Sequence, residues 1–188
     1  MRLLKWGIVV GLGLALIPAL RGDRDGVRGP EPGAAALAAA ADKEARSQEA
    51  PKAADFVLPD PEGKKVRLRD QRGKVVVLSF WATWCPPCRE EMPHLQALHT
   101  KYKGKPVRVI AVNLDQQGKP LREWLTERKL TFTTLADTNQ KVAAQYGVQG
   151  IPTLLVLDQQ GTIRHRAEGF DPNMEKELST LIDGLLKK

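Results

Sequence analysis

The chain has 188 residues, of which 27% are charged, with a formal net charge of +7 and only two cysteines. This length allows one domain with a hydrophobic core of its own, so a fold held together by several disulfides is excluded. No basic cluster is interleaved with aromatic side chains, and nucleic-acid binding is therefore not expected.

Residues 1–20 are predicted to direct the chain out of the cytoplasm. Arg2 and Lys5 precede an uncharged stretch that ends at Leu20, which is long for a signal-peptide core and short for a spanning helix of about 20 residues. Ile17–Ala19 would make a poor cleavage site, so an uncleaved membrane anchor is favoured over a cleaved signal peptide; a buried core helix is the third alternative. Either of the first two predicts an extracytoplasmic location, on the periplasmic side of the inner membrane, where disulfides are available.

Residues 21–54 consist mainly of Gly, Pro, Ala and charged residues, with almost no large apolar side chains. Such a segment cannot bury enough apolar surface to fold. We therefore predict a flexible linker at 21–54 that tethers a folded domain at 55–188.

The domain alternates between two hydrophobic patterns. Apolar and alternating runs predict strands at 66–68, 75–80, 107–113, 131–135, 153–157 and 162–168. Amphipathic patterns predict helices at 89–102, 120–129, 140–146 and 174–186. This alternation is typical of an α/β fold with a central mixed β-sheet flanked by helices.

Both cysteines lie in one pentapeptide, Trp84-Cys85-Pro86-Pro87-Cys88, between a predicted strand and a predicted helix. Free backbone N–H groups and the helix dipole favour an anion at a helix N-terminus, so the Cys85 thiol should ionise more readily than a free thiol. With two residues between the cysteines, Cys88 can resolve a mixed disulfide formed at Cys85. The pentapeptide therefore predicts a dithiol–disulfide exchange site.

Three other interpretations of the cysteine pair fit the sequence less well. A structural disulfide closing so short a loop would restrict the unfolded chain little. A zinc half-site would need further ligands, and His94, His99 and His165 do not have the usual spacing, so no metal site is expected. A peroxidatic cysteine would not need a second cysteine so close.

The segment 79–93, which contains the pentapeptide, resembles the active-site segment of the thioredoxin-like superfamily. It is more narrowly similar to the membrane-anchored TlpA/ResA group of extracytoplasmic thiol-disulfide oxidoreductases. The resemblance extends over residues 55–186, and its second anchor is Gly147–Thr153. It implies a thioredoxin-like fold with an N-terminal extension at 56–68 and an insert after Asn113.

The resemblance also implies roles for residues outside the pentapeptide. It implies a cis peptide bond before Pro152, which would leave the backbone of Ile151 free to pair with an extended substrate beside Cys85. We also expect Trp84, Pro86 and Pro87 to contribute to the substrate-binding surface, whereas Trp81 is expected in the core.

Thioredoxins carry a buried acid at the position that corresponds to Ser79. Glu91 is the candidate replacement as the group that transfers protons at Cys88, because residues three apart share one helix face and ResA-like proteins have an acid there. The alternative is that Glu91 is an ordinary acid of the first helical turn, favoured by the helix dipole.

The leading hypothesis is a membrane-tethered thiol-disulfide oxidoreductase that reduces disulfides of extracytoplasmic proteins, as in cytochrome c maturation or at a copper-site cysteine pair. The alternatives are an oxidant that forms disulfides, and a metallochaperone that binds Cu(I) through Cys85 and Cys88. No cofactor is expected besides the redox-active Cys85–Cys88 disulfide. The expected partners are protein disulfide substrates, a membrane electron donor and the membrane itself, and we expect a monomer.

Overall fold

The computed structural model describes residues 50–116 and 121–187. The predicted anchor at 1–20 and most of the predicted linker lie outside the described residues. The last part of the predicted linker packs on the domain, since Ala53 is buried and Lys52 forms a β-bridge with Thr162. Within the described ranges, no helix combines the length and apolar character that crossing a membrane requires.

A five-stranded sheet with the strand order β5-β4-β3-β6-β7 forms the centre of the domain. Its strands are β3 (Val75–Trp81), β4 (Val107–Asn113), β5 (Thr133–Ala136), β6 (Thr153–Leu157) and β7 (Ile163–Glu168). The central strand β3 pairs parallel with β4 and antiparallel with β6, which confirms the predicted mixed sheet. Every residue of β3 is buried, because layers cover both faces of the sheet, and this explains its unbroken apolar sequence.

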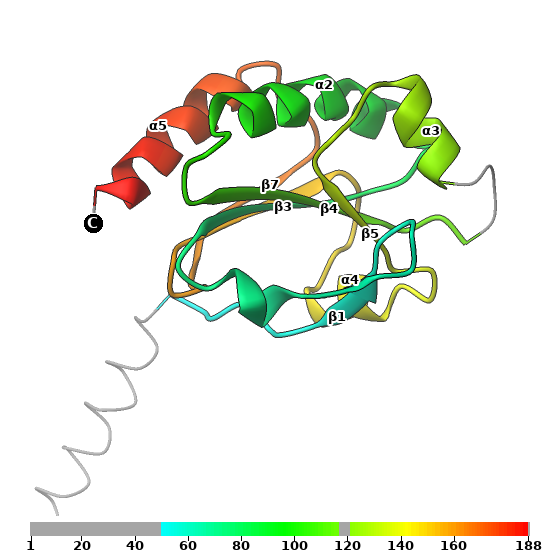
Figure 1. Cartoon of the computed structure of the whole chain (residues 1–188), viewed down its shortest axis with the longest axis horizontal. Coiled ribbons are helices and arrows are strands. Elements are labelled where there is room, and N and C mark those ends of the chain that lie inside the picture. Colours follow the sequence, from blue (N-terminus) through cyan, green and yellow to red (C-terminus); the bar gives the residue numbers. More distant parts are fainter. Residues whose placement is uncertain (1–49, 117–120, 188) are drawn as a thin grey trace, which may run out of the picture. The chain divides into compact units, whose positions relative to one another are not determined.

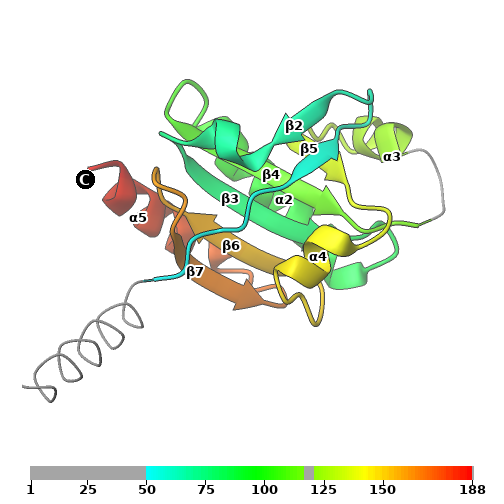
Figure 2. The ribbon, with the colours of Figure 1, turned by 90° about the horizontal axis from the view of Figure 1, so that it is seen from below.

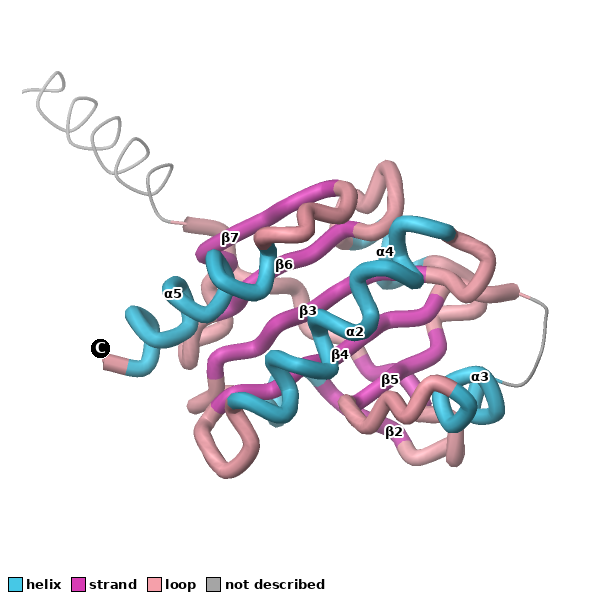
Figure 3. The backbone as a smooth tube through the Cα atoms, turned by 90° about the horizontal axis from the view of Figure 1, so that it is seen from above, coloured by secondary structure: helices cyan, strands magenta, loops and turns pink. Residues whose placement is uncertain are grey.

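Helices cover one face of the sheet, and a hairpin with a short helix covers the other (Figures 1 and 2). Figure 3, seen from above, shows α2 (Pro86–Lys101), α3 (Leu121–Glu127) and α5 (Met174–Leu186) in front of the strands. The opposite face carries the hairpin of β1 (Val57–Pro59) and β2 (Lys65–Arg67), the 3-10 turn η1 (Leu68–Gln71) and α4 (Lys141–Gln145). This is the predicted thioredoxin-like arrangement of layers.

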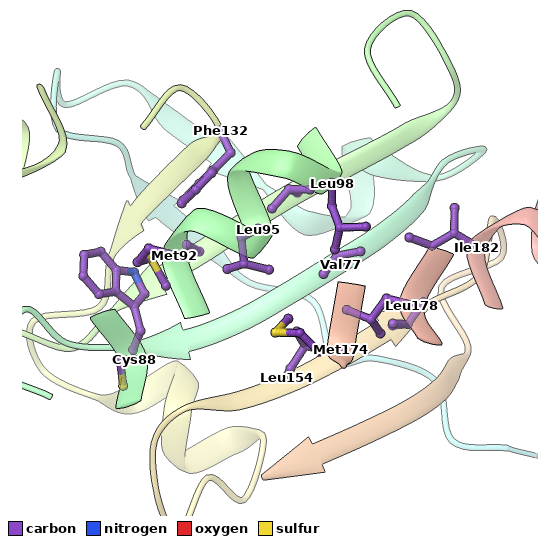
Figure 4. Close-up of a cluster of buried hydrophobic side chains, with 14 of the residues drawn as sticks. Val77, Cys88, Met92, Leu95, Leu98, Phe132, Leu154, Met174, Leu178 and Ile182 are labelled. Carbon is purple, nitrogen blue, oxygen red and sulfur yellow. The ribbon is translucent and has the colours of Figure 1, made fainter. Parts of the chain in front are cut away.

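The core between α2, α5 and the sheet holds the start of α2 in place. Figure 4 shows side chains of α2 and α5 packed over the strands: Cys88, Met92, Leu95 and Leu98 from α2, Met174, Leu178 and Ile182 from α5, and Val77 and Leu154 from the sheet. The α2 residues recur at the spacing of one helix face. The first turn of α2 is therefore fixed against the sheet at the carboxyl end of β3.

The helix α2 begins at Pro86, three residues before the predicted start at Arg89. The two prolines mislead a prediction from sequence because proline is a helix breaker in the interior. At the first helical positions the backbone N–H groups have no intrahelical acceptor, so proline is tolerated there. Cys88 consequently lies within the first turn of the helix rather than in the loop before it.

Candidate active site

The two cysteines lie where the chain leaves β3 and enters α2. Cys85 is the N-cap residue, and its Sγ accepts a hydrogen bond from the backbone N–H of Cys88 at 3.2 Å. The two residues form a disulfide, with their Cα atoms 5.3 Å apart. An N-cap position satisfies one of the free N–H groups of the first turn, so the sulfur of Cys85 lies where the helix favours a thiolate.

The surroundings of the two sulfurs differ in exposure. Cys88 is completely buried, and Cys85 is 3% exposed beside Trp84, whose exposed fraction is 64%. Pro86 and Pro87 are also exposed. Of the two cysteines, Cys85 is the one that retains exposed surface; its role as the attacking cysteine stays a prediction.

The loop before β6 faces Cys85 from the other side. The peptide bond between Ile151 and Pro152 is cis, which confirms that expectation. The carbonyl oxygen of Ile151 lies 3.7 Å from Sγ of Cys85. In the disulfide this sulfur carries no hydrogen, so the approach is a contact; in the reduced protein the same carbonyl can accept a hydrogen bond from the Cys85 thiol.

Ile151 and Trp84, the two neighbours of Cys85 at this contact, also line a groove with a volume of about 340 Å³; Cys85 itself is not in the lining. Trp84 and Ile151 line it together with Leu114 and residues of α4 and the loop after it. Its lining, within the part of the chain that the structure describes, contains no charged side chain. The structure thus brings two predicted substrate-binding residues, Trp84 and Ile151, into one groove, whereas Pro86, Pro87 and Pro152 lie outside its lining.

Glu91 lies on the buried side of the same helical turn. Its exposed fraction is 1%, and its Oε2 accepts a hydrogen bond from Oγ of Ser79 at 2.6 Å. Burial raises the pKa of the Glu91 carboxyl to about 7, and the hydrogen bond from Ser79 opposes part of that rise. Because α2 begins at Pro86, Glu91 lies beyond the first turn and faces the sheet, which contradicts the interpretation as an ordinary first-turn acid.

The sequence marks Ser79 only as the position of a missing acid. The structure shows that it is the hydrogen-bond donor to the acid that comes from α2 instead. The strand position that holds a carboxyl group in thioredoxins is here occupied by a hydroxyl that positions a carboxyl group. One signal could have indicated this pair, namely a polar residue inside an otherwise apolar buried strand, since such a residue needs a partner.

Trp81 and His94 pack against other aromatic side chains rather than lining the groove. Trp81 is buried and its ring lies 4.8 Å from that of Trp124. His94 packs on Phe170 with ring centroids 5.3 Å apart. Across residues 50–116 and 121–187, no group of three or more His, Cys, Asp or Glu side chains is arranged to hold a metal ion.

Comparisons with known proteins agree with this geometry. The model of the AhpC/TSA family matches residues 50–166. The thiol-disulfide oxidoreductase ResA of Bacillus thuringiensis (strain Al Hakam) is 37% identical over 148 residues, which cover 79% of this chain and 82% of ResA. The thioredoxin-like protein YneN of Bacillus subtilis is 38% identical over 144 residues, or 75% of this chain and 84% of YneN.

Solved structures show the same similarity. A crystal structure from Chlorobium tepidum, assigned as a thiol:disulfide interchange protein DsbE, superposes with a TM-score of 0.69 at 37% identity; the match covers 74% of this chain and 98% of that one. The crystal structure of StoA from Bacillus subtilis has a TM-score of 0.59 at 27% identity, covering 68% of this chain and 96% of StoA.

Proposed function

This chain belongs to the AhpC/TSA family of thioredoxin-like proteins and is a thiol-disulfide oxidoreductase; from this premise we propose that it is tethered to the membrane and reduces disulfides of proteins outside the cytoplasm. One observation carries the exchange chemistry of this proposal. The Cys85–Cys88 disulfide caps α2 between a surface groove and a buried carboxyl group that titrates near neutral pH.

The proposed reaction proceeds in two exchange steps. The thiolate of Cys85 in the reduced protein attacks a substrate disulfide, so that one substrate sulfur leaves and a mixed disulfide forms at Cys85. The thiol of Cys88 then gives its proton to the Glu91 carboxylate and attacks Sγ of Cys85. The second substrate sulfur leaves, the Cys85–Cys88 disulfide forms, and two electrons have passed to the substrate.

The groove beside Cys85 is the proposed site for the substrate. An extended segment that lies along Trp84 can pair with the backbone of Ile151. Pro86 and Pro87 are exposed next to Trp84 in the sequence, whereas Pro152 is buried and can act only by shaping the backbone of Ile151. Because the groove lining carries no charged side chain among the described residues, apolar or uncharged residues next to the substrate cysteine fit it best.

The tether and the direction of electron flow rest on the sequence and the family resemblance. Residues 1–20 are the proposed anchor, and a membrane dithiol protein is the proposed electron donor that regenerates the reduced cysteines. Mass analysis of the native protein tests the anchor, since a mature N-terminus near Leu20 would contradict it and leave a soluble periplasmic protein.

Trapping of partners tests the substrate class. A Cys88→Ser variant expressed in the native compartment should accumulate mixed disulfides at Cys85 with apocytochrome c or with a copper-site protein, because the resolving thiol is absent. The reduction potential of the native pair separates the two directions of exchange. A potential near −120 mV, as in strong oxidants, would contradict a reductant, and a value near −270 mV or below would support it.

If the protein is instead a metallochaperone, the purified reduced form should bind Cu(I) tightly. Stoichiometric Cu(I) that is retained against a competing chelator, and lost in the Cys88→Ser variant, would support metal carriage instead of reduction.

A further inference from the structure

A second hollow lies on the buried side of the active site, between the end of the sheet and α5. Its volume is about 100 Å³, which is enough for several water molecules, because each needs at least about 10–15 Å³. Its lining includes Glu91, Leu154, His165, Ala167, Asp171 and Glu177. Glu91 is almost completely buried, whereas Asp171 and Glu177 are exposed. The hollow therefore runs from the buried carboxyl group towards the surface.

The register of the sheet explains why the hollow begins at Glu91. Ser79, Leu154 and Ala167 are direct partners on β3, β6 and β7, so their side chains lie in one row on one face of the sheet. The first residue of the row donates its hydroxyl hydrogen to Glu91. The last lies on β7, the outermost strand on this side of the described sheet. The small side chain of Ala167 leaves space where a larger one would fill the row.

The hollow and the substrate groove lie on different sides of the cysteine pair. The groove is lined by residues around α4, and the hollow by residues of β7 and α5. In Figure 1, α4 and α5 lie on opposite faces of the sheet. A protein substrate that covers Trp84 and Ile151 would close access from the groove but would leave the hollow open.

We propose that Glu91 exchanges its proton with solvent through this hollow, with His165 as the positioning residue that passes the proton between the water inside and the surface. The proposal rests on the proposed role of Glu91 in proton transfer. The step transfers one proton and no electrons: the proton that Glu91 takes from the Cys88 thiol leaves to solvent through water in the hollow.

The titratable groups around Glu91 support this assignment. Asp171 and Glu177 contribute carboxyl groups from the loop after β7 and from α5. Residues from β3 and β6, Ser79 and Leu154, do not titrate. On α2 itself the titratable neighbours are Cys88 and His94, and the latter faces Glu175, with 3.6 Å between Nδ1 and Oε2. His165 contributes the imidazole of the lining, whose two ring nitrogens, one a donor and one an acceptor, can each hydrogen-bond to water.

The direct test follows the protonation of Glu91 in the oxidised protein by infrared spectroscopy of its carboxyl band after a pH jump. We expect Ala167→Leu, which fills the hollow, to slow this relaxation several-fold. His165→Asn should also slow it, and added imidazole should restore it. The matched control is Ala144→Leu, the same substitution in the groove lining, which should weaken the use of protein substrates and leave Glu91 relaxation unchanged.

The second measurement is the decay of the mixed disulfide with a protein substrate bound. Ala167→Leu and His165→Asn should each slow this decay several-fold and leave the rate of the first attack by Cys85 unchanged. If Ala167→Leu does not fold, His165→Asn with imidazole still decides the proposal. Relaxation and decay like those of the native protein in His165→Asn would overturn it. If Glu91→Gln alone slows the decay, the path is wrong and the role of Glu91 stands; if Glu91→Gln also matches the native protein, that role fails as well.

Discussion

The two cysteines are three residues apart at the start of one helix, yet different groups surround them. Cys85 borders a groove without charged lining residues in the described chain, next to an exposed indole and a backbone carbonyl. Cys88 is fully buried on the same helix face as Glu91, three residues on, whose carboxyl group accepts a hydrogen bond from Ser79. The proposed sites of substrate recognition and proton transfer therefore lie on opposite sides of the turn.

The helix itself produces this division. Cys85 is the N-cap and follows the exposed Trp84, whereas Cys88 and Glu91, three positions apart, share the face that packs on the sheet. An acid placed on that face lies near the resolving sulfur without lying in the path of the substrate. Each side can therefore be changed separately, and the following variants use this separation.

Substitution of either cysteine should give the largest effect and a different result for each. Cys85→Ser should lose turnover entirely, because no attacking sulfur remains. Cys88→Ser should still attack and should stop at the mixed disulfide. Alkylation of the reduced native protein at mildly acid pH, followed by peptide mass analysis, should show Cys85 labelled first. Equal labelling of the two cysteines would show that the difference in their surroundings does not control reactivity.

Glu91→Gln should slow the resolving step by about 10²-fold, the lower end of the usual contribution of a general base. In the native protein this step needs the carboxylate, so its rate should rise with pH and level off above about 7. In the variant it should continue to rise as the Cys88 thiol itself ionises. Stopped-flow decay of a preformed mixed disulfide measures both profiles.

The control for this prediction is Glu90→Gln, which removes an exposed carboxyl group from the adjacent position. It should behave like the native protein across the same pH range. Glu91→Gln that matches Glu90→Gln would show that solvent supplies the proton.

The sequence predicted the parts of the site that are local. The apolar run of β3, the following helix and the position of the cysteines between them depend on residues close in sequence, and the structure contains all three. The cis bond before Pro152 was implied by the family resemblance, since an Ile-Pro dipeptide by itself says little about isomer state.

The sequence did not predict the parts that depend on packing between distant elements. The hydrogen bond from Ser79 to Glu91 joins residues twelve positions apart in the sequence. It forms because of where α2 packs along β3, and this packing height is set by distant contacts. The hollow beside Glu91 depends on the register of β6 and β7, which includes an irregularity at Val156 and Leu157. Neither packing height nor a strand irregularity is visible in a hydrophobic pattern.

The stability of the oxidised protein should report the cost of burying Glu91. An acid whose pKa is about 7 in the folded protein and 4.5 in the unfolded chain keeps its proton longer when folded. The free energy of unfolding should therefore fall as pH rises from about 4.5 to about 7, by about 3 kcal/mol in total. Glu91→Gln should lack this fall and should be the more stable protein at pH 8.

Urea unfolding of both oxidised proteins at pH 5 and pH 8 measures this difference, with Glu90→Gln again as the exposed control. A native protein whose stability changes no more between these pH values than that of Glu91→Gln would contradict the raised pKa.

Trp84→Ala should give the smallest effect, and it should be confined to the groove side. Because 64% of Trp84 is exposed, its removal should change the free energy of unfolding by no more than about 0.5 kcal/mol. Trp81→Ala, which removes a completely buried indole, should lower the free energy of unfolding by about 3–5 kcal/mol.

Against a protein substrate, Trp84→Ala should raise KM about tenfold, since contact tryptophans often contribute more than 1 kcal/mol to binding. The variant should reduce a small disulfide that does not fill the groove at the native rate. It should also resolve the mixed disulfide at the native rate, because neither process uses the indole. Steady-state kinetics with both substrates tests this prediction. An equal loss of activity for the small and the protein substrate would show that Trp84 acts on the chemistry of Cys85 rather than on docking. The division between the two sides of the turn would then be wrong.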